Sequence, residues 1–201
     1  MDAFQSWAKF LHPETLKSNL LATSLYIVAW ESLCNAVVKQ LYDFYHFPND
    51  HDEGGYSEDY KERVLAFDRK SELRASLLWF KDCGAIDDSD IALVDELRRH
   101  RNEITHELPA FISQANREVN LALFEKMLRL ISKVDRWWIL NIELDCNPEF
   151  DKMDRAAIAD DEVSSGRMVF LSMLFQIATG DGQEAMAFYN EFVARAKSQT
   201  S

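Results

Sequence analysis

The sequence predicts an all-α protein, and three observations lead to that prediction. The chain of 201 residues contains only six glycines and four prolines, too few for the many turns of a β-sandwich. Hydrophobic residues make up 47% of it, with thirteen phenylalanines and five tryptophans, which excludes a disordered chain. Apolar residues recur at helical spacing through most of its length. We expect a single compact multi-helix domain spanning 1–201, since this length suits one core.

The first part of the chain predicts a short helix followed by a long central one. Segment 1–11 carries an apolar stripe at helical spacing, which suits packing on the body or a partner-binding arm, with packing preferred. The stripe consists of Phe4, Trp7, Phe10 and Leu11. Pro13 fits the first position of a helix that continues to about Tyr45. Because residues 20–30 are almost all apolar, we expect this helix to be buried on more than one side.

Residues 49–57 (NDHDEGGYS) predict a solvated loop after the long helix. Their histidine and carboxylates match the spacing of neither an HExxH motif nor a calcium-binding EF-hand, so no metal site is expected. Helical periodicity resumes over 58–82, and Gly84 suits the position that follows a helix end. The acidic residues of 87–90 suit the start of the next helix.

The remaining chain predicts further helices. Past Pro109, a long helix is expected from about Gln114 to Asp145. Trp137 and Trp138 near its end point in two directions, so one indole is expected in the core and the other in the core or an interface rather than stacked on a base. Residues 149–198 predict a C-terminal helical extension, including a helix over 163–178 and a capped last helix from Asp181.

The densest basic cluster, 98–106 (RRHRNEITH), ends one of the predicted helices. Three arginines against one glutamate give 3 − 1 = +2 with neutral histidines, in a chain of net charge −12. The residue before a proline is disfavoured in the α conformation, so the helix should stop near Glu107. Arg101, Asn102 and His106 would then lie in its last turns, accessible and beside a loop.

The spacing of these three residues is compatible with chemistry on a phosphodiester. Asn102 and His106 form an i, i+4 pair on one helix face, and Arg101 lies roughly 140° around the helix from His106. An arginine presents two donors to phosphate oxygens, and a histidine can move a proton near neutral pH, without a metal ion. A purely structural interpretation stays open, since basic residues at a helix C-terminus also complement its dipole.

The hexapeptide RNEITH at 101–106 resembles the Arg-x4–6-His motif of the HEPN superfamily, including the polar residue that often follows the arginine. The resemblance covers 60–145 best and implies a HEPN-like core over about 14–145. It further implies an all-α homodimer in which two motifs meet across a cleft between subunits. The activity that it implies is metal-independent endoribonuclease cleavage without a cofactor, in a toxin or defence role.

The resemblance also implies a role for each residue. His106 would act on the ribose 2′-OH or the leaving oxygen, Arg101 would hold and neutralise the scissile phosphate, and Asn102 would orient the pair. Attack by the 2′-OH leaves a 2′,3′-cyclic phosphate end. Arg98 and Arg99 are the candidate residues that bind further RNA phosphates.

Charge leaves a second interpretation open. A net charge of −12 argues against an extended basic surface for long nucleic acid, but two copies of the cluster can form a local basic cleft. The acidic surface equally suits a basic regulatory protein. The alternative function is therefore a non-catalytic helical module that binds a protein or a nucleotide.

The sequence differs from one toxin branch of the family. In that branch a tyrosine, which a partner enzyme modifies, follows the histidine by two positions. That position is Leu108 here, so this form of regulation is not expected.

No targeting segment or membrane span is expected. Asp2, Gln5 and Lys9 interrupt any apolar leader, and no run of roughly 18 apolar residues occurs. The sequence therefore predicts a cytoplasmic protein that does not enter a membrane. Its three cysteines are widely spaced and lie in helical settings, which predicts buried free thiols. They are Cys34, Cys83 and Cys146.

Overall fold

The computed structural model is predominantly helical in the residues that it describes, with no strand among them, so the predicted all-α class is confirmed. It describes 3–46, 55–146, 158–159, 162–180 and the positions 186–187, 189–191, 193 and 195. The chain's own contacts group it into two units, Met1–Ser165 and Gly166–Ser201, which are treated separately below.

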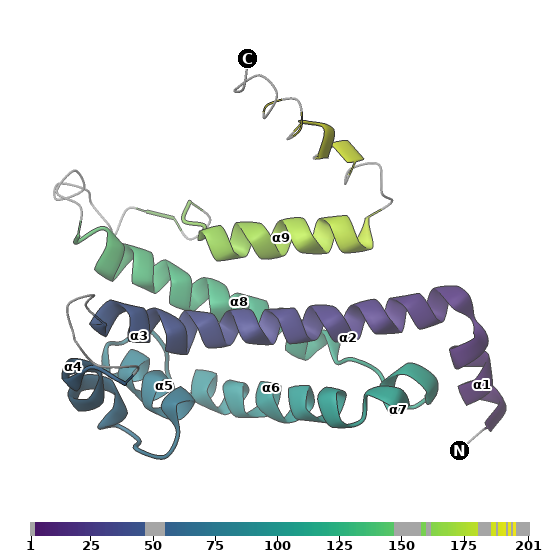
Figure 1. Cartoon of the computed structure of the whole chain (residues 1–201), viewed down its shortest axis with the longest axis horizontal. Helices are drawn as coiled ribbons and strands as arrows, with labels where there is room; N and C mark the ends of the chain where they lie inside the picture. The colour runs from purple at the N-terminus through teal and green to yellow at the C-terminus, as the bar shows by residue number, and fades with distance from the viewer. Residues whose placement is uncertain are drawn as a thin grey trace. The chain divides into compact units, whose positions relative to one another are not determined.

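The first unit is a bundle of helices (Figure 1). In chain order they are α1 (Ala3–Leu11), α2 (Pro13–Cys34), the π-helical turn η1 (Asn35–Lys39), α3 (Gln40–Tyr45), α4 (Glu58–Tyr60), the π-helical turn η2 (Lys61–Leu65), α5 (Glu72–Asp82), α6 (Asp88–His106), α7 (Leu108–Ser113), α8 (Leu121–Trp138) and the π-helical turn η3 (Ile139–Glu143). The packing of α2 against both α6 and α8 forms the centre of this unit.

The long helix predicted from Pro13 to Tyr45 is confirmed as the continuous run α2–η1–α3. Pro13 takes its first position, and the His12 side chain caps it by accepting the backbone N–H of Thr15 at 3.3 Å. By length and composition this run could cross a membrane, but 44% of its most apolar window is buried inside the protein. The central helix of a soluble protein passes the same test.

Tyr26 of α2 marks the junction of the three central helices. Its fully buried hydroxyl donates a hydrogen bond to the carbonyl oxygen of Leu97 in α6 at 3.2 Å. Its ring lies 5.0 Å from the His100 ring of α6 and 6.1 Å from Phe124 of α8, centroid to centroid. A polar group buried in this way needs its hydrogen bond, which fixes α6 against α2 just before the basic cluster begins.

The prediction of one helix over 58–82 is wrong in its middle. The chain leaves the helical path between Leu65 and Glu72, where Asp68 Oδ1 accepts the backbone N–H groups of Lys70 (2.8 Å) and Ser71 (3.2 Å). This local turn competes with helix continuation, and Ser71 then caps α5. Gly84 follows α5 with φ +76°, as its predicted place after a helix end requires.

The start of α6 agrees with the prediction, whereas the start of the next long helix does not. Asp87 and Asp90 form a capping box at the α6 N-terminus. Pro109, expected only to end a helix, lies in the first turn of α7. The long helix α8 starts at Leu121 rather than near Gln114, because the Asn120 side chain caps it by accepting the backbone N–H of Leu123 at 3.1 Å.

The remaining predictions have mixed outcomes. Trp138 is buried, and Trp137 packs edge-on against Trp79 at 6.1 Å between centroids, so both indoles contact the core. The cysteines are free, but Cys83 and Cys146 are exposed, so their predicted burial is wrong.

In the second unit, α9 (Gly166–Thr179) occupies the predicted helix over 163–178. The loop core 47–54, most of 149–161 and the cap at Asp181 fall outside the described residues.

Candidate functional site

The RNEITH segment occupies the last turns of α6, where the sequence places it. The helix ends at His106, and the backbone N–H of Glu107 donates a hydrogen bond to the Glu103 carbonyl oxygen at 2.8 Å. Asn102 and His106 are exposed, whereas Ile104 between them is buried in the core. One face of this segment therefore anchors the helix end, and the opposite face offers its polar side chains to solvent.

Arg101 is the most constrained residue of the motif. Its guanidinium Nη2 forms an ion pair with Glu31 Oε1 of α2 at 3.3 Å, and its Nη1 donates to the Asn102 side-chain oxygen at 3.4 Å. The Nε group is buried and has no hydrogen-bond partner within the described residues. The structure thus brings Arg101 and Asn102 together, and adds Glu31, an acid 70 residues away that no sequence pattern indicated.

Cys34 lies close to this ion pair, but its thiol is unsuited to nucleophilic chemistry. Burial, and then the negative charge of Glu31, raise the pKa of Cys34 to about 11, whereas Arg101 lowers it. The thiol is therefore protonated at neutral pH, and the thiolate is the reactive form.

His106 differs from Arg101 in having no recorded side-chain hydrogen bond, ion pair or ring contact to any described residue. It is exposed at the end of α6 and lies five residues from Arg101, so the two side chains flank one helix face without meeting. An imidazole that the fold leaves unused can accept or donate a proton when a substrate arrives.

Arg98 and Arg99 are exposed and both are held near Asp95, one turn earlier in α6. Arg98 forms an ion pair with the Asp95 carboxylate at 3.5 Å, and Arg99 Nε donates to the Asp95 carbonyl oxygen at 3.4 Å. Such exposed contacts contribute little free energy, so phosphate oxygens can displace them. In the absence of phosphate, the contacts with Asp95 make the surface of the 98–106 cluster less positive than its count of arginines suggests.

His100, in the same cluster, has a structural role that sequence reasoning did not assign. Its Nε2 accepts the backbone N–H of Asn120 at 3.0 Å, and its Nδ1 lies 3.4 Å from Glu103 Oε2. Because Nε2 is an acceptor, the ring is the tautomer that carries its proton on Nδ1. His100 therefore ties the end of α6 to the start of α8 and is not available for catalysis.

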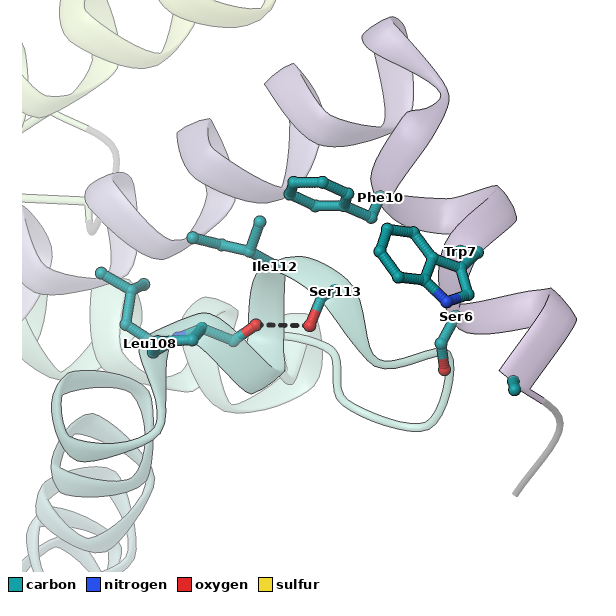
Figure 2. A pocket seen from close by; sticks show the side chains of 8 residues that line it. Ser6, Trp7, Phe10, Leu108, Ile112 and Ser113 are labelled. Carbon is teal, nitrogen blue, oxygen red and sulfur yellow. Dashed lines mark hydrogen bonds between the residues drawn. The ribbon is translucent and has the colours of Figure 1, made fainter.

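An apolar groove lies next to the motif, between α1 and α7. We call it the α1/α7 groove; it has a volume of about 610 Å³. It is lined by Ala3, Ser6, Trp7, Phe10, Leu108, Pro109, Ile112 and Ser113. Figure 2 shows Trp7 and Phe10 of α1 on one side and Leu108 and Ile112 of α7 on the other. Its edge at Leu108 is two residues from His106.

Helix α1 is attached to the protein through its polar side. Lys9 Nζ donates to the carbonyl oxygens of Gln114 (3.0 Å) and Arg117 (2.6 Å), and the Ser6 hydroxyl accepts the N–H of Ala115 at 3.4 Å. Its apolar residues remain exposed, with Phe4 at 79% and Trp7 at 62%. The preferred prediction of a short helix that packs on the body is therefore confirmed, since α1 contacts α2 and α7, but its apolar stripe stays largely exposed.

The described residues contain no group of three or more histidine, cysteine or carboxylate side chains arranged to hold a metal ion. Comparisons with protein-family models, with curated proteins and with solved structures found no match to this chain. The motif and the α1/α7 groove are therefore the observations on which a function can be proposed.

Proposed function

We propose that the chain is a metal-independent endoribonuclease of the HEPN type that acts as a homodimer in a toxin or defence role. The observation that carries the proposal is the position of RNEITH at an exposed end of α6, in an all-α chain, with His106 unused by the fold. In this proposal His106 moves the proton of the ribose 2′-OH or of the leaving oxygen. Arg101 neutralises the phosphate and Asn102 orients its guanidinium.

The Glu31–Arg101 ion pair affects how Arg101 binds a phosphate, because the Glu31 carboxylate occupies the same guanidinium group. Glu31 is about half exposed, so the pair is screened by water and its net free energy is small, on the order of 1 kcal/mol or less. A phosphate that carries a full charge can compete for the same guanidinium through two parallel hydrogen bonds. We propose that RNA binding exchanges the Glu31 carboxylate for the scissile phosphate.

Cleavage of mixed RNA in the presence of EDTA tests this function. The wild-type protein should cleave, whereas His106→Ala and Arg101→Ala should not. Two matched controls should retain the wild-type rate: His12→Asn, which replaces another exposed histidine and keeps a capping side chain, and Arg129→Ala, which removes an exposed arginine paired within α8. Equal cleavage by wild type and His106→Ala would remove the proposal.

A non-catalytic interaction module remains a second candidate because of the α1/α7 groove. Exposed aromatic residues beside an apolar cavity are unusual on a monomer and mark a surface that binds another molecule. Under this alternative the net charge of −12 selects a basic partner. RNA cleavage that depends on Arg101 and His106 favours the enzyme, whereas an absence of cleavage in every variant favours the module.

A further inference from the structure

A second cavity lies far from the motif along the chain, between η1 and α3, the residues just before α4, and the start of α5. It has a volume of about 500 Å³, within the range of small-molecule sites. Its lining residues are Val38, Lys39, Tyr42, Gly55, Tyr56 and Glu72. We call it the tyrosine pocket. None of its residues belongs to the RNEITH motif or to the α1/α7 groove, so it needs an account of its own.

Aromatic rings form two walls of the tyrosine pocket at nearly a right angle. The rings of Tyr42 and Tyr56 have centroids 6.0 Å apart and an angle of 77° between their planes. The fully buried Tyr60 supports both of them, at 5.7 Å from Tyr42 and 5.4 Å from Tyr56. The packing of His46 parallel to Tyr42 at 5.2 Å holds that ring further. The walls are thus fixed before any ligand arrives.

The Glu72 carboxylate gives the tyrosine pocket a negative charge. Its Oε1 accepts a hydrogen bond from the Tyr60 hydroxyl at 3.0 Å. It forms no ion pair with any residue that the structure describes. Its charge is the first cause that raises the pKa of Tyr56, so it acts on the pocket wall. A carboxylate that has no basic partner among the described residues retains its capacity to attract a cation.

Lys39, the basic residue among the described residues of the lining, does not neutralise this charge. The Lys39 ammonium lies 2.7 and 2.9 Å from the two oxygens of Asp43, its neighbour one turn later in the helix. That pair is locally neutral, so Glu72 leaves the lining with a net negative charge. Aromatic faces carry negative potential as well, and both features favour a positively charged guest.

The chemistry of the walls selects the kind of cation. A primary ammonium is compact and strongly hydrated, so contact with ring faces costs it most of its water. A trimethylammonium group spreads its charge over methyl groups that pack against aromatic rings, which is why such groups are bound in aromatic cages. We propose that the tyrosine pocket binds a trimethylammonium group, with Tyr42 and Tyr56 against the methyl groups and Glu72 as the counter-charge.

A matched pair of probes tests the proposal on the purified full-length chain. Choline and its neutral isostere 3,3-dimethyl-1-butanol have almost the same shape and differ in charge. Isothermal titration at constant ionic strength should give binding of choline, and binding of the isostere weaker by about tenfold. A short peptide that contains trimethyl-lysine forms a second arm, and the tighter of the two cationic probes identifies the source of the group.

Three variants locate the binding. Glu72→Gln keeps an acceptor for the Tyr60 hydroxyl and should weaken choline binding about fivefold, and Tyr56→Leu should weaken it by a similar factor. The control is Glu14→Gln, which removes another glutamate from the first turn of a helix, and it should bind as wild type does. Circular dichroism verifies that each variant is folded.

Three results would overturn the proposal. The first is an absence of choline binding and peptide binding by the folded wild-type protein. The second is equal affinity for choline and its neutral isostere, which would make the cavity a simple apolar site. The third is the same loss in Glu14→Gln as in Glu72→Gln, which would reduce the effect to overall charge. RNA cleavage does not enter this experiment, so its outcome is independent of the ribonuclease proposal.

Discussion

The two ends of α6 are built in different ways. At the N-terminal end, the Asp87 side chain accepts the backbone N–H groups of Ser89 (2.8 Å) and Asp90 (3.1 Å). Asp90 in turn accepts the Asp87 N–H at 3.0 Å and pairs with Lys133 of α8 at 2.6 Å. At the C-terminal end, Arg101 has a distant acid as its partner, and His106 has no recorded partner within the described chain.

The side chains at the N-terminal end of α6 stabilise the helix, whereas some of those at its C-terminal end are available for another role. Every polar group named at the N-terminal end satisfies a backbone group or a neighbouring charge, as a capping box does. At the other end Ile104, His100 and Glu107 make the structural contacts, whereas Asn102 and His106 are exposed to solvent. The four predictions that follow test whether the two ends differ in function as well.

The largest expected effect is on catalysis at the C-terminal end. His106→Ala should lower the rate of RNA cleavage by about 100-fold or more, the usual contribution of a general acid or base, so that its products fall below detection in incubations that give cleavage with the wild-type protein. The thermal unfolding midpoint should stay at the wild-type value because the His106 side chain is exposed and forms no hydrogen bond, ion pair or ring contact with a residue that the structure describes. Single-turnover cleavage and a thermal melt measure the two quantities. A large shift of the midpoint would instead assign a structural role to His106.

The second effect is on stability at His100. His100→Phe keeps the aromatic packing against Tyr26 and Phe111 but removes the acceptor for the Asn120 N–H. It should lower the free energy of unfolding by about 1 kcal/mol, the usual net contribution of one hydrogen bond. Urea unfolding measures the difference. An unchanged free energy would show that water replaces the imidazole at the start of α8.

The third effect concerns the N-terminal cap and its pH dependence. Hydrogen bonds from the Ser89 side chain and from the backbone lower the pKa of Asp87, so its contribution to stability is present above the unfolded-state pKa and is lost as pH falls through the lower folded-state value. Asp87→Ala should therefore lower the unfolding midpoint by about 2–4 °C at pH 7, and by less in acid. A pH-independent difference would contradict this assignment.

The smallest effect is expected at Glu31. Glu31→Gln removes the charge that competes with phosphate for Arg101 and should strengthen RNA binding about twofold to fivefold with little change in stability. Fluorescence anisotropy with an RNA that carries 2′-deoxy sugars measures binding without cleavage. Glu14→Gln, which breaks an exposed pair with Lys17 in the same helix, is the matched control. Weaker binding in Glu31→Gln would mean that the acid positions Arg101 for the substrate.

Local chemistry explains which parts of the fold could be predicted. Pro13 and Asp87 determine helix starts within one turn of themselves, and Gly84 permits a backbone conformation that other residues avoid. The break at Asp68 was missed because an aspartate turn interrupts a stretch whose apolar spacing still looks helical. Pro109 was misjudged because the same residue suits both the end of one helix and the first turn of the next.

Long-range contacts explain what was missed at the candidate site. The motif and its place at a helix end follow from residues adjacent in sequence, whereas the Glu31–Arg101 pair joins residues 70 positions apart. Periodicity identified the apolar stripe of α1 but does not say which side of a helix contacts the protein. The hydrogen bonds of Lys9 to Gln114 and Arg117 decide that question, and no local pattern indicates them.

The ends of the RNA products test the central claim most directly. An RNA with a single ribose among 2′-deoxy sugars, incubated with the protein in EDTA, should be cut only after that ribose. Mass spectrometry of the fragments should show a 2′,3′-cyclic phosphate with the wild-type protein and no product with His106→Ala. Cleavage that requires a divalent ion, that leaves a 3′-hydroxyl or that persists in His106→Ala would contradict the account.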